Sequence, residues 1–143
     1  RCLVQEFGAS VNEAATPGST PLHIAAQAGH EHIVRCLIKE YGANVDQFWE
    51  SGCTALYAAA QKGHEHIVRC LVKEFGADVN TAADDGSTAL YIAAERGHEH
   101  VVRCLLGECG ANVDHLNVCG TTALYVAAQE GHENIVRCLV KEH

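Results

Sequence analysis

The sequence lacks methionine entirely and has only one tryptophan among its 143 residues. It also lacks any run approaching the roughly 20 consecutive apolar residues that a membrane-spanning helix needs. The basic amphipathic pattern of a targeting peptide is missing from its start. We therefore expect a soluble protein and, because the chain begins at Arg1 without a methionine, a piece of a longer one.

Positive charge is scarce as well. Ten Lys and Arg residues stand against 18 Asp and Glu, which gives a formal net charge of −8, and the basic residues are spread along the chain. Binding to a phosphate backbone needs clustered basic residues, so nucleic acid is excluded as an expected partner. With 48% apolar and 20% charged residues, the chain has the composition of a folded domain rather than a disordered tail.

Motifs for catalysis and metal binding are absent. The sequence has no Cys-x-x-Cys, no Gly-rich phosphate loop and no paired carboxylates. The histidines of each pair are two residues apart, at His30/His32, His64/His66 and His98/His100. On a helix this spacing points the two rings to different sides, whereas the histidines of a helical zinc site are four residues apart. We therefore expect neither enzymatic activity nor a metal or cofactor in this chain.

Five of the eight cysteines form a regular series. They recur every 34 residues within the string Arg-Cys-Leu, at Cys2, Cys36, Cys70, Cys104 and Cys138. Equivalent residues on stacked helices lie about 8 to 10 Å apart, beyond the Cα separation of about 7 Å that a disulfide tolerates. We interpret them as small buried hydrophobes of a reducing compartment, cytoplasmic or otherwise intracellular. Cys53, Cys109 and Cys119 lie outside this series.

The same period organises the whole chain. Gly-His-Glu recurs at Gly29, Gly63, Gly97 and Gly131. Residues 1–11 correspond to the end of a unit, residues 12–45, 46–79 and 80–113 are full units, and residues 114–143 are a unit without its closing turn. The near identity of these units fits both recent duplication and design. We treat residues 1–143 as a single repeat domain.

Each unit predicts two short helices and an extended loop. In the second unit, Thr54 is a plausible N-cap and Gly63 a C-cap for the first helix. Residues 65–74 carry apolar side chains at the spacing of one helical face. A polar stretch with turn residues follows Gly76. Because helices this short are marginal alone, each unit must pack on the next, which predicts a solenoid.

These units resemble the ankyrin repeat. Its Thr-Pro-Leu-His signature is intact at Thr20 and reads Thr-Ala-Leu-Tyr at Thr54, Thr88 and Thr122, and the Ala-Ala, Gly-His and Gly-Ala-Asp/Asn-Val strings also match. The resemblance implies an all-α solenoid of helix-turn-helix units with projecting hairpin loops. It also implies a protein partner, held on the concave surface that the hairpin tips and first helices form.

Three features depart from the family pattern. The period is 34 rather than 33, and the extra residue falls near residues 73–75, where an aromatic recurs as Phe7, Tyr41 and Phe75, so we expect a packed ring there. Tyrosine replaces the signature histidine in three units, which predicts a partly buried ladder with hydroxyls near water: Tyr57, Tyr91 and Tyr125. The aspartate usual in the hairpin is replaced in every unit, by Ala15, Trp49, Ala83 and Asn117. These replacements put the geometry of the hairpin in question.

Differences between the units indicate where function lies. They concentrate in the hairpins, at residues 13–17, 47–51, 81–85 and 115–119, and at the end of the first helix, at residues 28, 62, 96 and 130. This variation fits a recognition surface, and it also fits unconstrained drift of exposed loops. The adjacent aromatics Phe48 and Trp49, which we expect to face solvent at a hairpin tip, favour binding. The candidate partner-binding residues are Gln47, Phe48, Trp49, Glu50, Lys62, Asp84, Asp85, Arg96, His115, Leu116, Asn117 and Glu130.

Two further hypotheses remain open. Ordinary internal apolar residues occupy both ends of the chain, including Cys2 and Leu3 at one end and Ile135 and Leu139 at the other. Such ends predict fraying or end-to-end self-association, so the array could be a structural spacer or a self-assembling rod. Thiol-mediated redox regulation through Cys53 or Cys119 is the other hypothesis, which predicts rapid labelling of both thiols in the folded protein.

Overall fold

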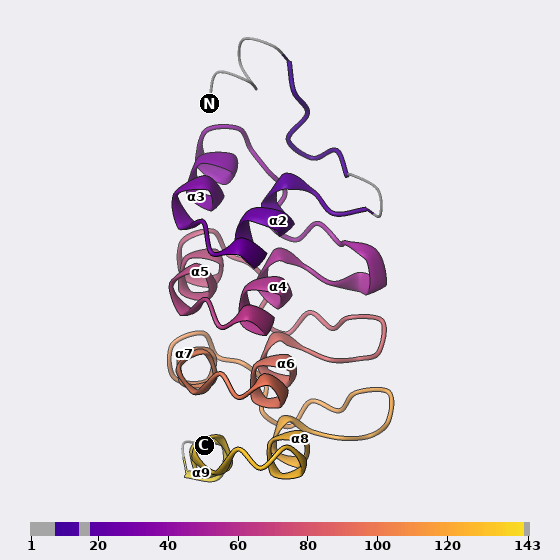
Figure 1. Ribbon diagram of the computed structural model, residues 1–143, viewed down its shortest axis with the longest axis vertical. Coiled ribbons are helices and arrows are strands. Elements are labelled where there is room, and N and C mark those ends of the chain that lie inside the picture. The colour runs from indigo at the N-terminus through magenta and orange to yellow at the C-terminus, as the bar shows by residue number, and fades with distance from the viewer. Residues whose placement is uncertain (1–7, 15–17, 142–143) are drawn as a thin grey trace.

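Paired helices stack into an elongated array in the computed structural model, which describes residues 8–14 and 18–141 (Figure 1). The inner column contains the first helix of each unit, α2 (Pro21–Ala28), α4 (Ala55–Lys62), α6 (Ala89–Arg96) and α8 (Ala123–Gln129). The outer column contains α3 (Glu31–Lys39), α5 (Glu65–Arg69) continued by η2 (Cys70–Glu74), α7 (Glu99–Gly107) and α9 (Glu133–Lys141). A short 3-10 turn, η1 (Glu50–Gly52), lies in one hairpin. The described part of the chain contains no strand, so the fold is the predicted all-α solenoid.

Threonine begins each inner helix. The side-chain oxygens of Thr20, Thr54, Thr88 and Thr122 each accept a hydrogen bond from the backbone N–H three residues later. This bond satisfies one of the donors that the first turn of a helix leaves unpaired. Glycine then ends α2, α4 and α6 in the left-handed conformation, with φ between 79° and 83°. The predicted caps are therefore present.

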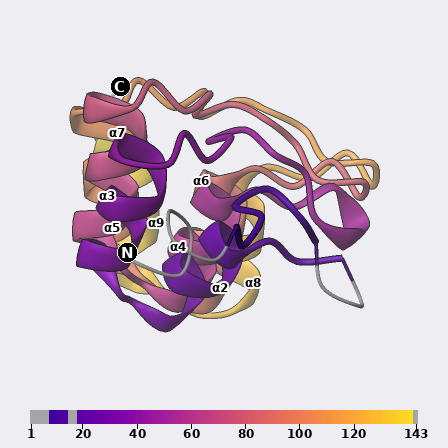
Figure 2. The same cartoon turned by 90° about the horizontal axis from the view of Figure 1, so that it is seen from above.

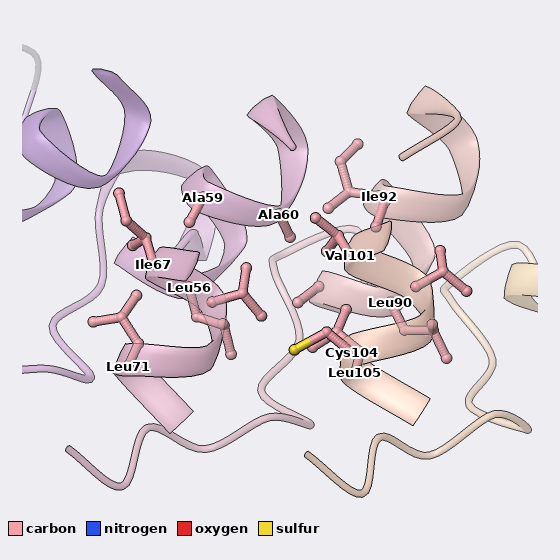
Figure 3. Close-up of a cluster of buried hydrophobic side chains, with 14 of the residues drawn as sticks. Leu56, Ala59, Ala60, Ile67, Leu71, Leu90, Ile92, Val101, Cys104 and Leu105 are labelled. Atoms are coloured by element: carbon pink, nitrogen blue, oxygen red, sulfur yellow. The ribbon is translucent and has the colours of Figure 1, made fainter. Parts of the chain in front are cut away.

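The core runs continuously between neighbouring units. Leu56, Ile67 and Leu71 of the second unit and Leu90 and Leu105 of the third are at most 3% exposed (Figure 3). Burying a leucine or isoleucine side chain stabilises a fold by about 1.5 to 3 kcal/mol. Each inner helix contacts the next inner helix, and each outer helix contacts the next outer one. Burial between units therefore holds the array together, as the short helices require.

The extra residue widens the end of the outer helix in the second and third units. In the second unit, the N–H of Phe75 bonds to the carbonyl of Cys70, five residues back, and η2 is a turn of π-helix. The N–H of Cys109 bonds in the same way to the carbonyl of Cys104. The widened turn lies where the repeat alignment predicted it. Tyr41 and Phe75 are half-buried beside it, and Phe7 lies outside the described residues.

Histidine joins successive units at the Gly-His turn. The Nε2 atoms of His64, His98 and His132 lie 2.8 to 3.0 Å from the backbone carbonyls of Gln27, Gln61 and Glu95. Each accepting carbonyl belongs to the preceding unit, so each bond crosses a joint between units.

Backbone hydrogen bonds also connect the hairpins. The N–H of Asp84 donates to the carbonyl of Ser51, and the N–H of Val118 donates to the carbonyl of Asp85, both at 2.9 Å. Turns at Ala83–Gly86 and Asn117–Gly120 close the third and fourth hairpins. The hairpins therefore keep their turns although Trp49, Ala83 and Asn117 replace the usual aspartate. Ala15 lies outside the described residues.

The cysteine series is less uniform than predicted. Cys70, Cys104 and Cys138 are buried, whereas Cys36 is only half-buried. Cys2 and Leu3 lie outside the described residues. Every cysteine in the part of the chain that the structure describes is free, without a disulfide.

Among the tyrosines, Tyr57 and Tyr91 are half-buried as expected. The hydroxyl of Tyr91 lies 3.2 Å from Thr121 Oγ1, so it pairs with protein rather than water alone. Tyr125 was wrongly predicted to be partly buried: it is 58% exposed, because no further unit covers it among the described residues. None of the described helices is long and apolar enough to cross a membrane.

Candidate functional site

The variable positions gather on one side of the array. Figure 2 shows the hairpins projecting from the stack beyond the inner helices. We use the name recognition surface for the hairpin tips at residues 47–51, 81–85 and 115–119 together with Lys62 and Arg96, which end α4 and α6, and Glu130, which follows α8. The variable tips therefore lie on one side of the array, while the apolar positions that repeat form the core.

Phe48 and Trp49 lie next to each other in the chain but point into different environments. Phe48 is 58% exposed. Trp49 is half-buried, and its ring lies 5.6 Å from the ring of His23 in the preceding unit. The prediction of two solvent-facing aromatics is therefore wrong for Trp49, because neighbouring residues of an extended segment point to opposite sides. Of these two rings, Phe48 is the one that is exposed to solvent.

His23 explains why Trp49 turns inward. The His23 ring is buried, accepts the backbone N–H of Thr20 at Nδ1 and donates from Nε2 to the carbonyl of Gln47 at 2.8 Å. Burial lowers the pKa of His23, an effect that the bond to Gln47 opposes in part. The backbone carbonyl of Gln47 therefore connects the second hairpin to the preceding unit. The half-buried side chain of Gln47 accepts a hydrogen bond at Oε1 from Asn44 Nδ2 at 3.4 Å.

A groove of about 240 Å³ lies between the second hairpin and α4. Its walls are Trp49, Glu50, Ser51, Cys53, Tyr57, Ala58 and Gln61. Burial, more than the nearby charges, raises the pKa of the Tyr57 hydroxyl, so this group stays protonated. The groove combines an apolar wall with hydroxyl, amide and carboxylate groups.

The fourth hairpin, like the second, contains both side chains that face solvent and side chains that bond within the fold. Leu116 and Val118 are 56% and 72% exposed, and Val118 lies outside the predicted set although its position in a variable tip indicated it. His115 is half-buried and its Nε2 lies 2.9 Å from the carbonyl of Gly86. Asn117 accepts hydrogen bonds from the backbone of Cys119 and Thr121. His115 and Asn117 therefore shape the hairpin, and the two apolar side chains face solvent.

Charged residues of the predicted set all lie at the surface. Asp84 and Asp85 are exposed at the tip of the third hairpin, although Asp85 also accepts the backbone N–H of Ser87. Lys62 and Arg96 are exposed at the ends of α4 and α6, as are Glu50 and Glu130 on the second hairpin and after α8. Acidic groups thus predominate at the tips, while the ends of α4 and α6 carry basic groups and the end of α8 carries an acidic one.

The thiols of the surface differ from expectation. Cys53 is half-buried in the groove, and burial followed by the charges of Asp85 and Asp84 raises its pKa. A raised pKa disfavours the reactive thiolate, so the structure does not support rapid labelling of Cys53. Cys119 is exposed. Within the described residues, His, Cys, Asp and Glu form no group of three or more that could hold a metal ion.

Comparison with known proteins agrees with the architecture. A family model of ankyrin repeats, three copies long, matches residues 1–83 and again residues 76–143, so that the two matches cover the whole chain. No curated protein sequence matches it. Ankyrin repeats generally serve as protein–protein interaction modules, and the family is typically non-enzymatic. With its stacked helix pairs, projecting hairpins and matching family model, the chain belongs to the ankyrin-repeat family.

Proposed function

We propose that this chain binds a partner protein through the recognition surface and performs no catalysis itself. The observation that carries the proposal is Phe48, a large ring that is 58% exposed at the tip of the second hairpin. Large exposed apolar side chains are typical of binding surfaces.

The chemistry of the surface favours a particular kind of partner. Phe48 and Leu116 offer apolar contacts on two hairpins, and Asp84 with Asp85 offers negative charge on the hairpin between them. A partner that places a basic side chain between two apolar ones would complement all three tips. The net charge of −8 also favours association with a basic surface. We propose an intracellular protein partner of this type, without nucleic acid.

A crosslinking experiment tests the proposal. Benzoyl-phenylalanine in place of Phe48 keeps an aromatic ring at the tip and captures whatever contacts it in lysate of the source cells. Affinity of the purified partner is then measured by calorimetry for the wild type, Phe48→Ser and His66→Ser. His66 is exposed on the outer helix α5, away from the recognition surface. Loss of a central aromatic contact should weaken binding by at least about tenfold.

The control variant decides between recognition and general instability. Retained affinity in His66→Ser, together with weakened binding by Phe48→Ser, supports binding through the hairpin tips. Equal affinity of Phe48→Ser and the wild type contradicts the proposed surface. An equal loss in both variants would place the contact elsewhere on the array.

Apolar exposure at the two ends favours a second candidate, a self-assembling rod. Ile24 and Ile33 of the first described unit are 50% and 51% exposed, and Tyr125 and Val140 of the last are 58% and 59% exposed. Stacking one copy on another would cover these side chains. Light scattering separates the two proposals, because Ile33→Ser and Val140→Ser should reduce self-association, whereas Phe48→Ser should leave it unchanged. A monodisperse monomer at high concentration rules the rod out.

A further inference from the structure

Cys104 and Cys109 bring two thiols together at the end of α7. Their Sγ atoms lie 3.9 Å apart, and the backbone N–H of Cys109 bonds to the carbonyl of Cys104 at 3.2 Å. The widened turn causes this proximity, because a hydrogen bond to the fifth preceding residue places positions 104 and 109 over one another. Neither residue has a role in the recognition surface.

The surroundings give the two thiols different chemistry. Cys104 is 2% exposed and belongs to the core, whereas Cys109 is half-buried at the surface of the turn. The hydrogen bond from Cys104 lowers the pKa of Cys109; burial and the charge of Glu108 oppose this effect, and Lys73 and Arg69 of the preceding unit add to it. The same hydrogen bond, followed by burial, raises the pKa of Cys104. Because Cys109 is also the more exposed of the two, we assign it as the attacking thiolate and Cys104 as the second thiol.

We propose that Cys104 and Cys109 form a site of reversible oxidation, at which a hydroperoxide converts the two thiols to a disulfide within one repeat. The Cys109 thiolate attacks the peroxide, forms a sulfenic acid and releases an alcohol or water after protonation of the leaving oxygen. The Cys104 sulfur then displaces hydroxide from that sulfenic acid, and its proton leaves with the hydroxide as water. Two electrons pass to the peroxide, and a thiol reductant restores both groups.

Closure of the disulfide requires a small movement. The sulfurs must approach from 3.9 Å to about 2.0 Å, the length of a disulfide bond. Cys109 lies beyond the last residue of α7, Gly107, and before Gly110, which has a φ of 70°. Side-chain rotation at Cys109 and adjustment of this glycine-flanked turn provide the movement without displacing the buried Cys104.

The pair is specific to the third unit among the described repeats. Position 109 corresponds to Tyr41 in the first unit and Phe75 in the second, while the series cysteine is present in both. A disulfide between Cys104 and Cys109 would restrict the movement of Glu108, which lies between them in the chain. Glu108 pairs with Arg69 of the preceding unit at 2.8 Å. Oxidation at this site is therefore expected to stiffen one joint of the array.

Peptide mapping of the intact chain tests this proposal. The reduced protein is treated with equimolar hydrogen peroxide, alkylated with N-ethylmaleimide, and digested with trypsin and a glutamate-specific protease. Cleavage after Glu108 separates the two cysteines, so a disulfide appears as a linked peptide pair that dithiothreitol splits. We expect this link, a loss of two titratable thiols per chain, and the same link in Cys119→Ser.

Cys109→Phe is the matched control, because it introduces the residue that the second unit has at Phe75. This variant should lose the link and keep its fold by circular dichroism. The link should form at least about tenfold faster in the native protein than in urea, since the folded turn holds the thiols together. Equal rates in urea, or oxidation that leaves these cysteines unlinked while Cys119 reacts, would overturn the proposal.

Discussion

At the scale of single residues, the second hairpin holds one aromatic side chain that faces solvent and one that packs within the fold. Phe48 faces solvent, while Trp49 packs on His23 and donates its backbone N–H to the carbonyl of Cys53 at 2.6 Å. The Trp49 indole Nε1 is buried without a hydrogen-bond partner among the described residues. Two neighbouring aromatics therefore have different consequences when they are substituted.

Stability measurements distinguish the two residues. Trp49→Ala should lower the free energy of unfolding by about 1 to 3 kcal/mol, less than the roughly 3 to 5 kcal/mol of a fully buried aromatic. Trp49→Phe should cost less than Trp49→Ala, because it keeps the contact with His23 and removes the unpaired indole donor. Phe48→Ser should stay within about 0.5 kcal/mol of the wild type in urea denaturation. A larger effect of Phe48→Ser would show that its ring packs within the fold.

His23 makes the first described unit sensitive to acid. Its pKa is lowered from the ordinary 6.5, mainly by burial, so the unfolded chain binds a proton at a higher pH than the folded one. The stability that neutral His23 provides is therefore present above about pH 6.5 and decreases as the pH falls below that value. The difference in melting temperature between the wild type and His23→Gln should shrink on acidification. A constant difference between pH 8 and pH 5 would contradict this assignment.

The candidate site was only partly predictable at this scale. Differences between units correctly located the variable tips, since a repeat shows which positions the fold dictates. They could not show that Gln47, His115 and Asn117 bond with the framework, because those bonds depend on which side of the hairpin each residue faces. A shift of one position reverses that side, and no periodicity in a five-residue tip reveals it.

At the scale of elements, the Gly-His turn is the joint between units. Glycine at positions 29, 63 and 97 adopts a positive φ, and the ring of the next unit's histidine lies directly against it. A Cβ atom at Gly63 would lie 2.7 Å from His98 Nδ1. Gly131 has a nearly identical φ of 78° and no atom within 4 Å of such a Cβ. The array thus contains its own control for the histidine contact.

Alanine at these two glycines should have unequal effects. Gly131→Ala should cost about 1 to 2 kcal/mol, the strain of a left-handed residue with a side chain. Gly63→Ala should cost about 1 to 3 kcal/mol more, because the added methyl group must displace the His98 ring from its bond to Gln61. Urea denaturation of both variants measures the difference. Equal losses of stability would mean that the histidine ring moves aside without cost.

Most of the element structure could be predicted from local signals. Threonine and glycine caps marked the inner helices, and the 34-residue period placed the extra residue at the end of the outer helix. The period did not predict hydrogen bonds to the fifth preceding residue, because an added residue can be accommodated in either a helix or a loop. The proximity of Cys104 and Cys109 depends on that choice, so the sequence alone did not reveal the thiol pair.

At the scale of the whole molecule, burial falls off toward the last unit. Leu56 and Leu90 are 3% and 1% exposed, whereas the equivalent Leu124 is only half-buried. Ala60 and Ala94 are fully buried, whereas the equivalent Ala128 is exposed. Stability of a solenoid is the sum of each unit's own stability and its contacts with neighbours. A unit with one neighbour is therefore less stable than a unit with two.

Hydrogen exchange should reveal this gradient. Backbone amides of α8 and α9 should exchange faster than those of α4, α5, α6 and α7, because opening the last unit breaks only one interface. Exchange followed by mass spectrometry on peptides from each unit measures the order. Uniform protection from α4 to α9 would indicate that the array unfolds as one cooperative unit.

The hairpins are connected to one another through backbone atoms, at Asp84 to Ser51 and at Val118 to Asp85. Such bonds are indifferent to the identity of the side chains that project from the tips. Point mutations at exposed tip positions such as Phe48 and Leu116 can therefore accumulate without weakening the frame. If the tips bind a partner as proposed, substitutions there would change the partner one hairpin at a time, so that binding specificity and folding would vary as separable traits.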